Sequence, residues 1–274
     1  MPQILDNIEK KLLPTLQESI KISNRADFCV GYFNLRGWKH LVSSIDRFTG
    51  KDDNCCRLLV GMQALPQDIL RRAIGLSKKD EILDNSTAIQ LRQKLADDFK
   101  KQLTLGTPSN EDEIGLQKLA CQIRSGKVKV KLFLRYPLHA KLYLLYRQDP
   151  ISPVISYLGS SNLTYAGLYR QGELNVDVPD QDACKKLVNW FEERWNDRWC
   201  IDISDELVRI INTSWAREDL VPPYHIYIKM AYHLSQEARE GLVEFRIPKD
   251  FGNQLFEFQK AAVQIAAHHL NRRG

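Results

Sequence analysis

Residues 28–61 run FCVGYFNLRGWKHLVSSIDRFTGKDDNCCRLLVG, and this stretch decides the fold. Its two ends, FCVGYF at 28–33 and CRLLVG at 56–61, are short apolar runs of the kind that form buried β-strands. Residues 38–48, which lie between them, have the apolar spacing of an amphipathic helix. This strand–helix–strand order predicts an α/β fold in which a mixed β-sheet is sandwiched by helices.

Similar elements are predicted on both sides of this stretch. Leu5 to Ile20 has helical spacing interrupted by Pro14, and residues 111–124 predict a second helix. The charged helical region at residues 67–99 is either a solvated face, which is the commoner case, or a DNA contact.

Residues 127–134, KVKVKLFL, alternate cleanly and place three lysines on one face of a predicted strand. This stripe is either a sheet edge protected against aggregation or a track for phosphate groups, and the sequence favours neither.

The residues with the clearest chemistry follow directly. Residues 138–145, LHAKLYLL, alternate as a strand does, so His139 and Lys141 are expected on one strand face. An imidazole beside an ammonium group does little for packing but suits an anionic ligand. Taken alone, the pair also fits a half-exposed strand with a solvated lysine, because motifs this short often match by accident.

A second polar group follows the predicted strand at residues 154–158, VISYL, which stops at a glycine. Ser160 and Asn162 come next, where small polar groups can donate hydrogen bonds to phosphate oxygens. An ordinary turn or helix cap is the plain alternative. Glu173 lies in the next alternating segment, and a carboxylate there could orient the ring of His139.

Together these residues resemble the single-motif members of the phospholipase D superfamily. The resemblance covers roughly residues 20–200, and its motifs are His139-x-Lys141, Gly159-Ser160-x-Asn162 and Glu173. The wider context, with GSSNLT at 159–164, resembles the domain of this superfamily that precedes bacterial superfamily-2 helicases. The family's motif has an Asp five residues after the Lys, where this chain has Tyr146, and that Asp mainly supports the fold around the site. Its absence bears on catalytic competence more than on the His-Lys pair.

The resemblance implies a metal-independent phosphodiesterase that forms a phosphohistidine and needs no cofactor. His139 would attack phosphorus, and a second histidine would protonate the leaving oxygen. Lys141, Asn162 and Ser160 would bind the non-bridging oxygens. The other five histidines have no lysine two residues on, so a homodimer is expected to supply the second set.

Composition agrees with a nucleic-acid partner without requiring one. The 274 residues have a formal net charge of +5, which is mildly basic. Six cysteines without zinc spacing are expected to be buried thiols in a reducing cytosol. The first residues have no secretion signal, and no apolar stretch approaches the roughly 20 residues that span a bilayer. A cytoplasmic protein without a membrane partner is therefore expected.

The character of the chain changes after Trp199. Residues 1–200 are expected to form the phospholipase D-like domain, residues 201–240 a helical connector, and residues 241–274 the start of a helicase motor. The segment LFEFQKAAV at 255–263 resembles the opening of superfamily-2 motors, where a Gln reads adenine, and Gln259 matches it. The plain alternative is an amphipathic helix. ATP and magnesium are expected only for a longer parent protein, because no phosphate-binding loop follows before Gly274.

The leading interpretation is a DNA phosphodiesterase, or nuclease, at the N-terminus of a helicase-type protein in restriction or repair. One alternative is a catalytically weak or inactive phospholipase D-like DNA-binding module. Another is a hydrolase of phospholipids or other small phosphodiesters. DNA is favoured by the helicase-like segment, since the His-Lys site specifies only a phosphodiester.

Overall fold

The computed structural model describes residues 2–61, 97–103, 107–218 and 255–273, and short pieces between residues 224 and 235. The chain divides into two compact units, residues 1–218 and 219–274. The charged region predicted at residues 67–99, either a solvated face or a DNA contact, lies almost entirely outside the described residues.

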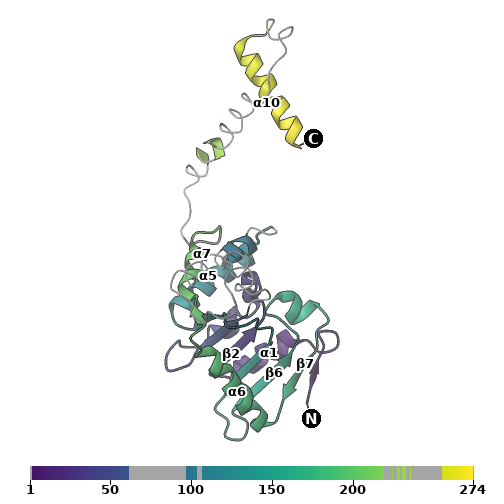
Figure 1. The fold of residues 1–274 in the computed structure, drawn as a ribbon, viewed down its shortest axis with the longest axis vertical. Helices are drawn as coiled ribbons and strands as arrows, with labels where there is room; N and C mark the ends of the chain where they lie inside the picture. The colour runs from purple at the N-terminus through teal and green to yellow at the C-terminus, as the bar shows by residue number, and fades with distance from the viewer. Residues whose placement is uncertain are drawn as a thin grey trace, which may run out of the picture. The chain divides into compact units, whose positions relative to one another are not determined.

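The first unit is built on a mixed eight-stranded sheet with the order β1-β7-β6-β5-β2-β3-β4-β8 (Figure 1). Its strands are β1 (Ile4–Leu5), β2 (Arg25–Val30), β3 (Cys56–Val60), β4 (Val128–Phe133), β5 (Leu142–Tyr146), β6 (Val154–Gly159), β7 (Asn175–Val178) and β8 (Cys200–Asp202). β2, β3 and β4 are parallel, and the other neighbouring pairs are antiparallel. The end of β2 therefore lies beside the start of β5, the end of β6 and the start of β7, so one edge of the sheet gathers the segments that carry the predicted site.

Helices cover both faces of this sheet, which confirms the predicted α/β architecture. They are α1 (Leu12–Lys21), η1 (Leu35–His40), α2 (Val42–Ile45), α5 (Asn110–Arg124), η2 (Ala166–Arg170), α6 (Gln181–Trp195) and α7 (Ser204–Asn212). Of the helices described, α6 alone packs on one face, through Cys184, Phe191 and Trp195. The other helices bury apolar side chains against the opposite face, where the larger core lies.

The helix predicted at residues 38–48 is wrong in detail. The structure has a 3₁₀-helix, η1, that starts three residues earlier, then the short helix α2. Asn34 sets the start, because its side chain accepts hydrogen bonds from the amides of Arg36 and Gly37. The tight turns bury Trp38 completely, and its indole nitrogen donates to Gln122 Oε1 at 2.8 Å.

The N-terminal helix also differs from the prediction. Leu5 belongs to strand β1, and α1 begins only at Leu12. Pro14 is the third residue of α1 and does not interrupt it, because a proline in the first turn removes no intrahelical hydrogen bond.

β8 covers part of the lysine stripe. It pairs with residues 131–133 of β4, so Lys131 stands between two strands and edge protection does not explain this lysine. Its ammonium group donates to the carbonyl oxygen of Trp195 at 3.0 Å, and Lys127 Nζ donates to the carbonyl oxygen of Asp46. Lys129 is exposed.

The first unit continues past residue 200, where a helical connector was expected to begin. β8 extends the sheet beyond β4, and the amide of Ile203 donates to Val130 O at 3.0 Å. α7 buries Leu207, Ile210 and Ile211 in the larger core, so this compact unit ends at Glu218. In the second unit the structure describes one long helix, α10 (Glu257–Arg273). No helix of the described residues is long and apolar enough to cross a membrane.

Candidate active site

The parallel strands β2 and β3 end side by side, each followed by a glycine. Val30 pairs with Val60, so Gly31 and Gly61 occupy equivalent places at the sheet's edge. A Cβ on Gly61 would lie 1.9 Å from the carbonyl oxygen of Leu138, and one on Gly31 would lie 3.2 Å from His139 Cδ2. The chain from β4 to β5 thus passes directly over both strand ends. At Gly61 only glycine leaves room for it, and at Gly31 a Cβ would be a tight fit.

His139 and Lys141 lie in this crossing segment and not on a strand, because β5 begins only at Leu142. The expected shared strand face is therefore wrong, but the two side chains still meet. Lys141 Nζ lies 2.7 Å from His139 Nδ1 and 2.8 Å from Nε2, and it donates to His139 O at 2.8 Å. His139 is exposed and Lys141 is only 4% exposed. An accessible imidazole therefore sits over a buried ammonium group.

Burial lowers the pKa of Lys141, because removal from water disfavours its charged form. The carboxylate of Glu173 opposes this shift, followed by a smaller effect of Cys29. Glu173 is therefore close enough to Lys141 to influence its charge.

The turn after β6 carries Ser160 and Asn162 to the same edge. Asn162 Oδ1 accepts a hydrogen bond from the amide of Tyr32 at 2.9 Å and would lie 3.5 Å from a Cβ on Gly31. Asn162 therefore stands beside His139, which borders the same glycine. The start of the turn is tied to the crossing segment, since the amide of Gly159 donates to Lys141 O at 3.2 Å.

Glu173 lies just before β7 and binds Ser160. The Ser160 hydroxyl donates to Glu173 Oε2, and the amide of Leu174 donates to Ser160 Oγ at 3.0 Å. The sequence had led us to expect that Glu173 contacts the ring of His139. Among the contacts of the described residues, none joins the two side chains. The carboxylate instead orients Ser160 and acts on the charge of Lys141.

A buried network that the sequence analysis did not assign supports this turn. Asn175 is 1% exposed, and its Nδ2 donates to Ser161 Oγ at 2.8 Å and to Leu5 O at 3.4 Å. Its Oδ1 accepts from the amide of Ser161, and Tyr143 donates to Ser161 O at 2.8 Å. Buried polar groups are hydrogen-bonded as a rule, and here the bonds join β1, β5 and β7 to the turn. The one sequence signal is an Asn at an inward position of an alternating strand.

Tyr146, which replaces the Asp of the family motif, lies far from these groups. It ends β5, five residues after Lys141, which is about 16 Å along an extended strand. The Arg25 guanidinium carbon lies 4.5 Å from the centre of its ring. Burial, reinforced by the Asp27 carboxylate, raises the pKa of Tyr146. The replacement thus lies in the scaffold and not among the groups gathered around His139.

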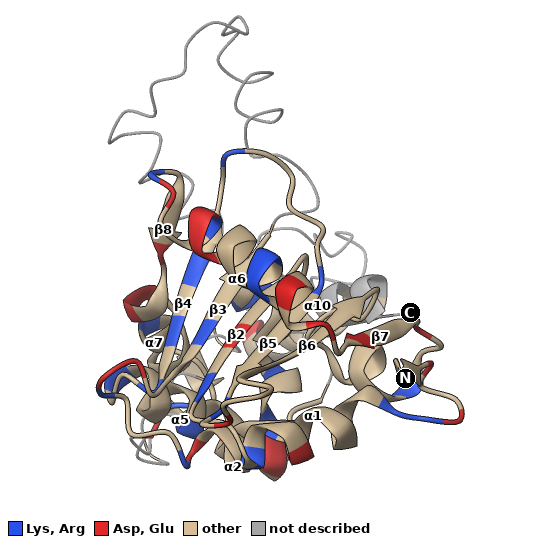
Figure 2. Ribbon diagram, turned by 90° about the horizontal axis from the view of Figure 1, so that it is seen from below, with Lys and Arg blue, Asp and Glu red and all other residues tan. Residues whose placement is uncertain are grey.

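Tyr146 packs on a network of charged side chains that ties α6 to the sheet. Asp27 is fully buried, and its carboxylate accepts hydrogen bonds at 2.7 Å from Arg57 and from Arg25. Both arginines also bind Glu192 of α6. Figure 2 shows the basic residues of β2, β3 and β4 on neighbouring strands beside α6. Asp27 holds both guanidinium groups in place, and these bind Glu192. The network therefore fixes α6 in one position against the sheet.

Gln259 lies in the first turn of α10, in the second unit. Its Oε1 accepts a hydrogen bond from the amide of Phe256 at 3.0 Å, so in this structure its side chain closes the start of the helix. The described residues contain no group of three or more His, Cys, Asp or Glu side chains that could hold a metal ion.

Comparison with known proteins identifies the family. The sequence model described as "Cardiolipin synthase, PLD-like domain" matches residues 56–195, just over half of the chain. A search among curated proteins found no match. Similar solved structures include Nuc, a phospholipase D family member from Salmonella typhimurium, at 15% identity and TM-score 0.40, covering 74% of this chain and 97% of Nuc. They also include NucT from Helicobacter pylori at 12% identity and TM-score 0.41, covering 74% of this chain and 98% of NucT. Phosphatidylserine synthase from Haemophilus influenzae is 13% identical with TM-score 0.43, covering 77% of this chain and 44% of the synthase. On the match of the sequence model, the chain belongs to the phospholipase D-like domain family.

Proposed function

We propose that this chain is a metal-independent phosphodiesterase that cleaves DNA through a phosphohistidine at His139. The observation that supports this best is the convergence at one sheet edge of an exposed imidazole, a buried ammonium group, a carboxamide and a hydroxyl group. His139, Lys141, Asn162 and Ser160 come from two chain segments, and Glu173 joins them from a third. Family membership agrees with a phosphodiester as the reacting group.

The chemistry proposed for the site balances in two steps. A neutral nitrogen of His139 attacks phosphorus and forms an N–P bond, while the P–O bond to the leaving group breaks and its oxygen takes a proton from a second histidine. In the second step that histidine takes a proton from water, whose oxygen attacks phosphorus and releases His139. In both steps Lys141 donates to a non-bridging oxygen of the phosphate instead of to His139. Asn162 stabilises the negative charge on the same oxygens.

The second histidine is proposed to be His139 of another copy of this chain. The first unit contains one further histidine, His40, which stacks on Tyr165 at 4.3 Å and belongs to η1 rather than to the crossing segment. A two-fold axis that brings two crossing segments together would supply one attacking and one protonating imidazole without any further residue.

DNA as the substrate rests on the helicase-like segment at residues 255–263 and on the net charge of +5. We propose that the chain is the N-terminal part of a helicase-type protein in restriction or repair, and that Gln259 contacts adenine in the full-length parent. A second candidate is a DNA-binding module with little or no turnover, favoured by Tyr146 at the place of the motif Asp.

The test is cleavage of single- and double-stranded DNA, and of methyl p-nitrophenyl phosphate, in excess EDTA. Wild type is compared with His139→Asn and with His40→Asn as the matched control. We expect metal-independent cleavage that His139→Asn abolishes and His40→Asn retains, with a covalent phosphoryl adduct on His139 after rapid alkaline quenching. DNA binding without cleavage of either substrate would favour the binding module. Cleavage that EDTA abolishes would overturn the phosphohistidine mechanism.

A further inference from the structure

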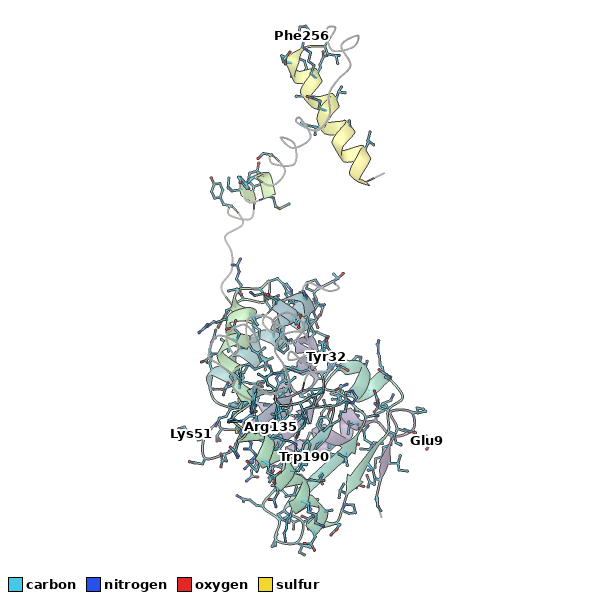
Figure 3. All side chains as sticks on the ribbon, in the orientation of Figure 1. Glu9, Tyr32, Lys51, Arg135, Trp190 and Phe256 are labelled. Carbon is cyan, nitrogen blue, oxygen red and sulfur yellow. The ribbon has the colours of Figure 1, made fainter. Side chains whose placement is uncertain are left out.

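Two tyrosine rings are partly exposed near His139, one at the end of β2 and one in the crossing segment, and neither has a role in the chemistry proposed above. Tyr32 and Tyr136 are each 39% exposed. Each ring presents an apolar face to water near the polar groups of the site, and such a face can stack on a base. Figure 3 labels Tyr32 and Arg135, the residue before Tyr136.

Tyr32 is fixed at the phosphate-binding side of His139. It follows Gly31, on which a Cβ would lie 3.2 Å from His139 Cδ2, and its amide donates to Asn162 Oδ1 at 2.9 Å. Phe33 then bridges to Leu163 as a strand would, so the backbone on both sides of Tyr32 is held against the Ser160–Asn162 turn. Tyr32 is therefore held next to Asn162, a group that would bind the scissile phosphate.

Tyr136 lies in the crossing segment itself, three residues before His139 and just past the end of β4. Its ring packs edge-on against the buried Phe133, with centroids 4.8 Å apart and planes at 71°, which fixes its orientation. β4 lies two strands from β2. At a spacing of about 4.8 Å between strands, the ends of the two strands that these tyrosines follow lie roughly 10 Å apart.

We infer that Tyr32 and Tyr136 are stacking sites for unpaired bases next to the scissile phosphate, so that the substrate is single-stranded DNA. This inference rests on the proposed phosphodiesterase site. A separation of this size spans about two nucleotides of an extended strand, and bases stack on aromatic rings regardless of sequence. A duplex hides the faces of its bases, and a small phosphodiester has none, so neither would use these rings.

The test is binding of fluorescein-labelled oligonucleotides, measured by anisotropy at fixed salt on the full chain. The probes are oligo(dT), an abasic strand of the same length, and a blunt duplex. The variants are Tyr32→Ala, Tyr136→Ala, and the rescue variants Tyr32→Trp and Tyr136→Trp. Ile151→Ala is the matched control, since Ile151 is 86% exposed and lies in the loop between β5 and β6, at the opposite edge of the sheet. Thermal unfolding of each variant checks that the fold is intact.

Each alanine variant is expected to bind oligo(dT) at least fivefold more weakly than wild type, as base–aromatic stacking predicts. The tryptophan variants should restore the affinity, and Ile151→Ala should not change it. Wild type and the alanine variants should bind the abasic strand equally, because without bases only the phosphate contacts remain.

Two results would overturn the inference: unchanged oligo(dT) affinity in the alanine variants, or an equal loss on the abasic strand. The inference would also be overturned if wild type bound the duplex more tightly than oligo(dT) and neither alanine variant weakened duplex binding. Failure of the proposed function would look different. Wild type would then cleave no methyl p-nitrophenyl phosphate, while the base-dependent loss of binding in the tyrosine variants persisted.

Discussion

Lys141 is the residue whose charge controls the candidate site, and its environment makes a prediction about pH. The Lys141 amine must be protonated to neutralise the phosphate, and burial lowers the pKa of this group below its ordinary value of 10.5. The charge is therefore lost at a lower pH than an exposed lysine would lose it. We expect kcat/KM for methyl p-nitrophenyl phosphate to fall on an alkaline limb that begins below pH 10.5, about tenfold per pH unit.

The neighbours of Lys141 provide the controls for this limb. Lys141→Arg should remove it from the accessible pH range, because a guanidinium group stays charged. Glu173→Gln should move it to lower pH, since the Glu173 carboxylate raises the pKa of Lys141 and its loss leaves burial unopposed. A limb that stays in place in both variants would show that another group titrates there.

At the residue scale, the sequence revealed the groups with distinctive chemistry and missed those whose importance is steric. His139, Lys141, Ser160, Asn162 and Glu173 stand out because such side chains seldom cluster for packing, and the structure gathers them at one edge. Their mutual contacts did not follow from spacing: the partner of Glu173 depends on where two turns meet in space. The support from Asn175 was hidden because an Asn in a strand has no single typical role.

Among the elements of the site, the crossing segment depends most directly on the two glycines under it. A methyl group on Gly61 would lie 1.9 Å from a backbone oxygen, which cannot be relieved by a side-chain rotation. We expect Gly61→Ala to lower the unfolding free energy by about 1–3 kcal/mol. Because the segment carries both His139 and Lys141, its displacement should lower kcat/KM by about 100-fold. Urea titration and kinetics with the small diester measure the two effects.

Gly172 provides the matched control for this substitution. It lies in the turn before Glu173, and a Cβ there would meet nothing closer than 3.9 Å. Gly172→Ala should leave the unfolding free energy unchanged and kcat/KM within about twofold of wild type. If Gly61→Ala were equally silent, the segment would have to be more adaptable than this packing indicates.

Elements predicted from the pattern of apolar residues were found where that pattern reflects burial in the core. β3, α5 and β6 are of this kind. The helix expected at 38–48 failed because a capping side chain and a buried indole decide its geometry, and periodicity registers neither. His139 and Lys141 alternate like strand residues yet precede the strand, because an extended segment that crosses strand ends has the same alternation as a strand.

At the scale of the whole molecule, the larger compact unit holds one set of site residues on a sheet braced on one face by α6. The charged network of Asp27, Arg25, Arg57 and Glu192 provides this brace, at the end of the strands remote from the site. Tyr146 belongs to the same region, so the loss of the motif Asp is compatible with an intact site edge. The strand order could not be read from the sequence, because β5 returns beside β2 after a long excursion through β3 and β4.

If two copies of the chain complete one site, activity depends on how copies are paired, and this can be measured by mixing. Wild type is titrated with His139→Asn at constant total concentration, after exchange of subunits. When each cleavage needs His139 from both copies, activity follows the square of the wild-type fraction, so an equal mixture retains about one quarter of the starting rate. A site that works within one copy would retain about one half. Dilution of wild type should also lower the specific activity as dimers dissociate, with sedimentation velocity reporting the dimer over the same concentrations. A linear titration, or an undiminished rate where only monomer sediments, would place both proton-transfer steps within a single chain and require a second base other than His139.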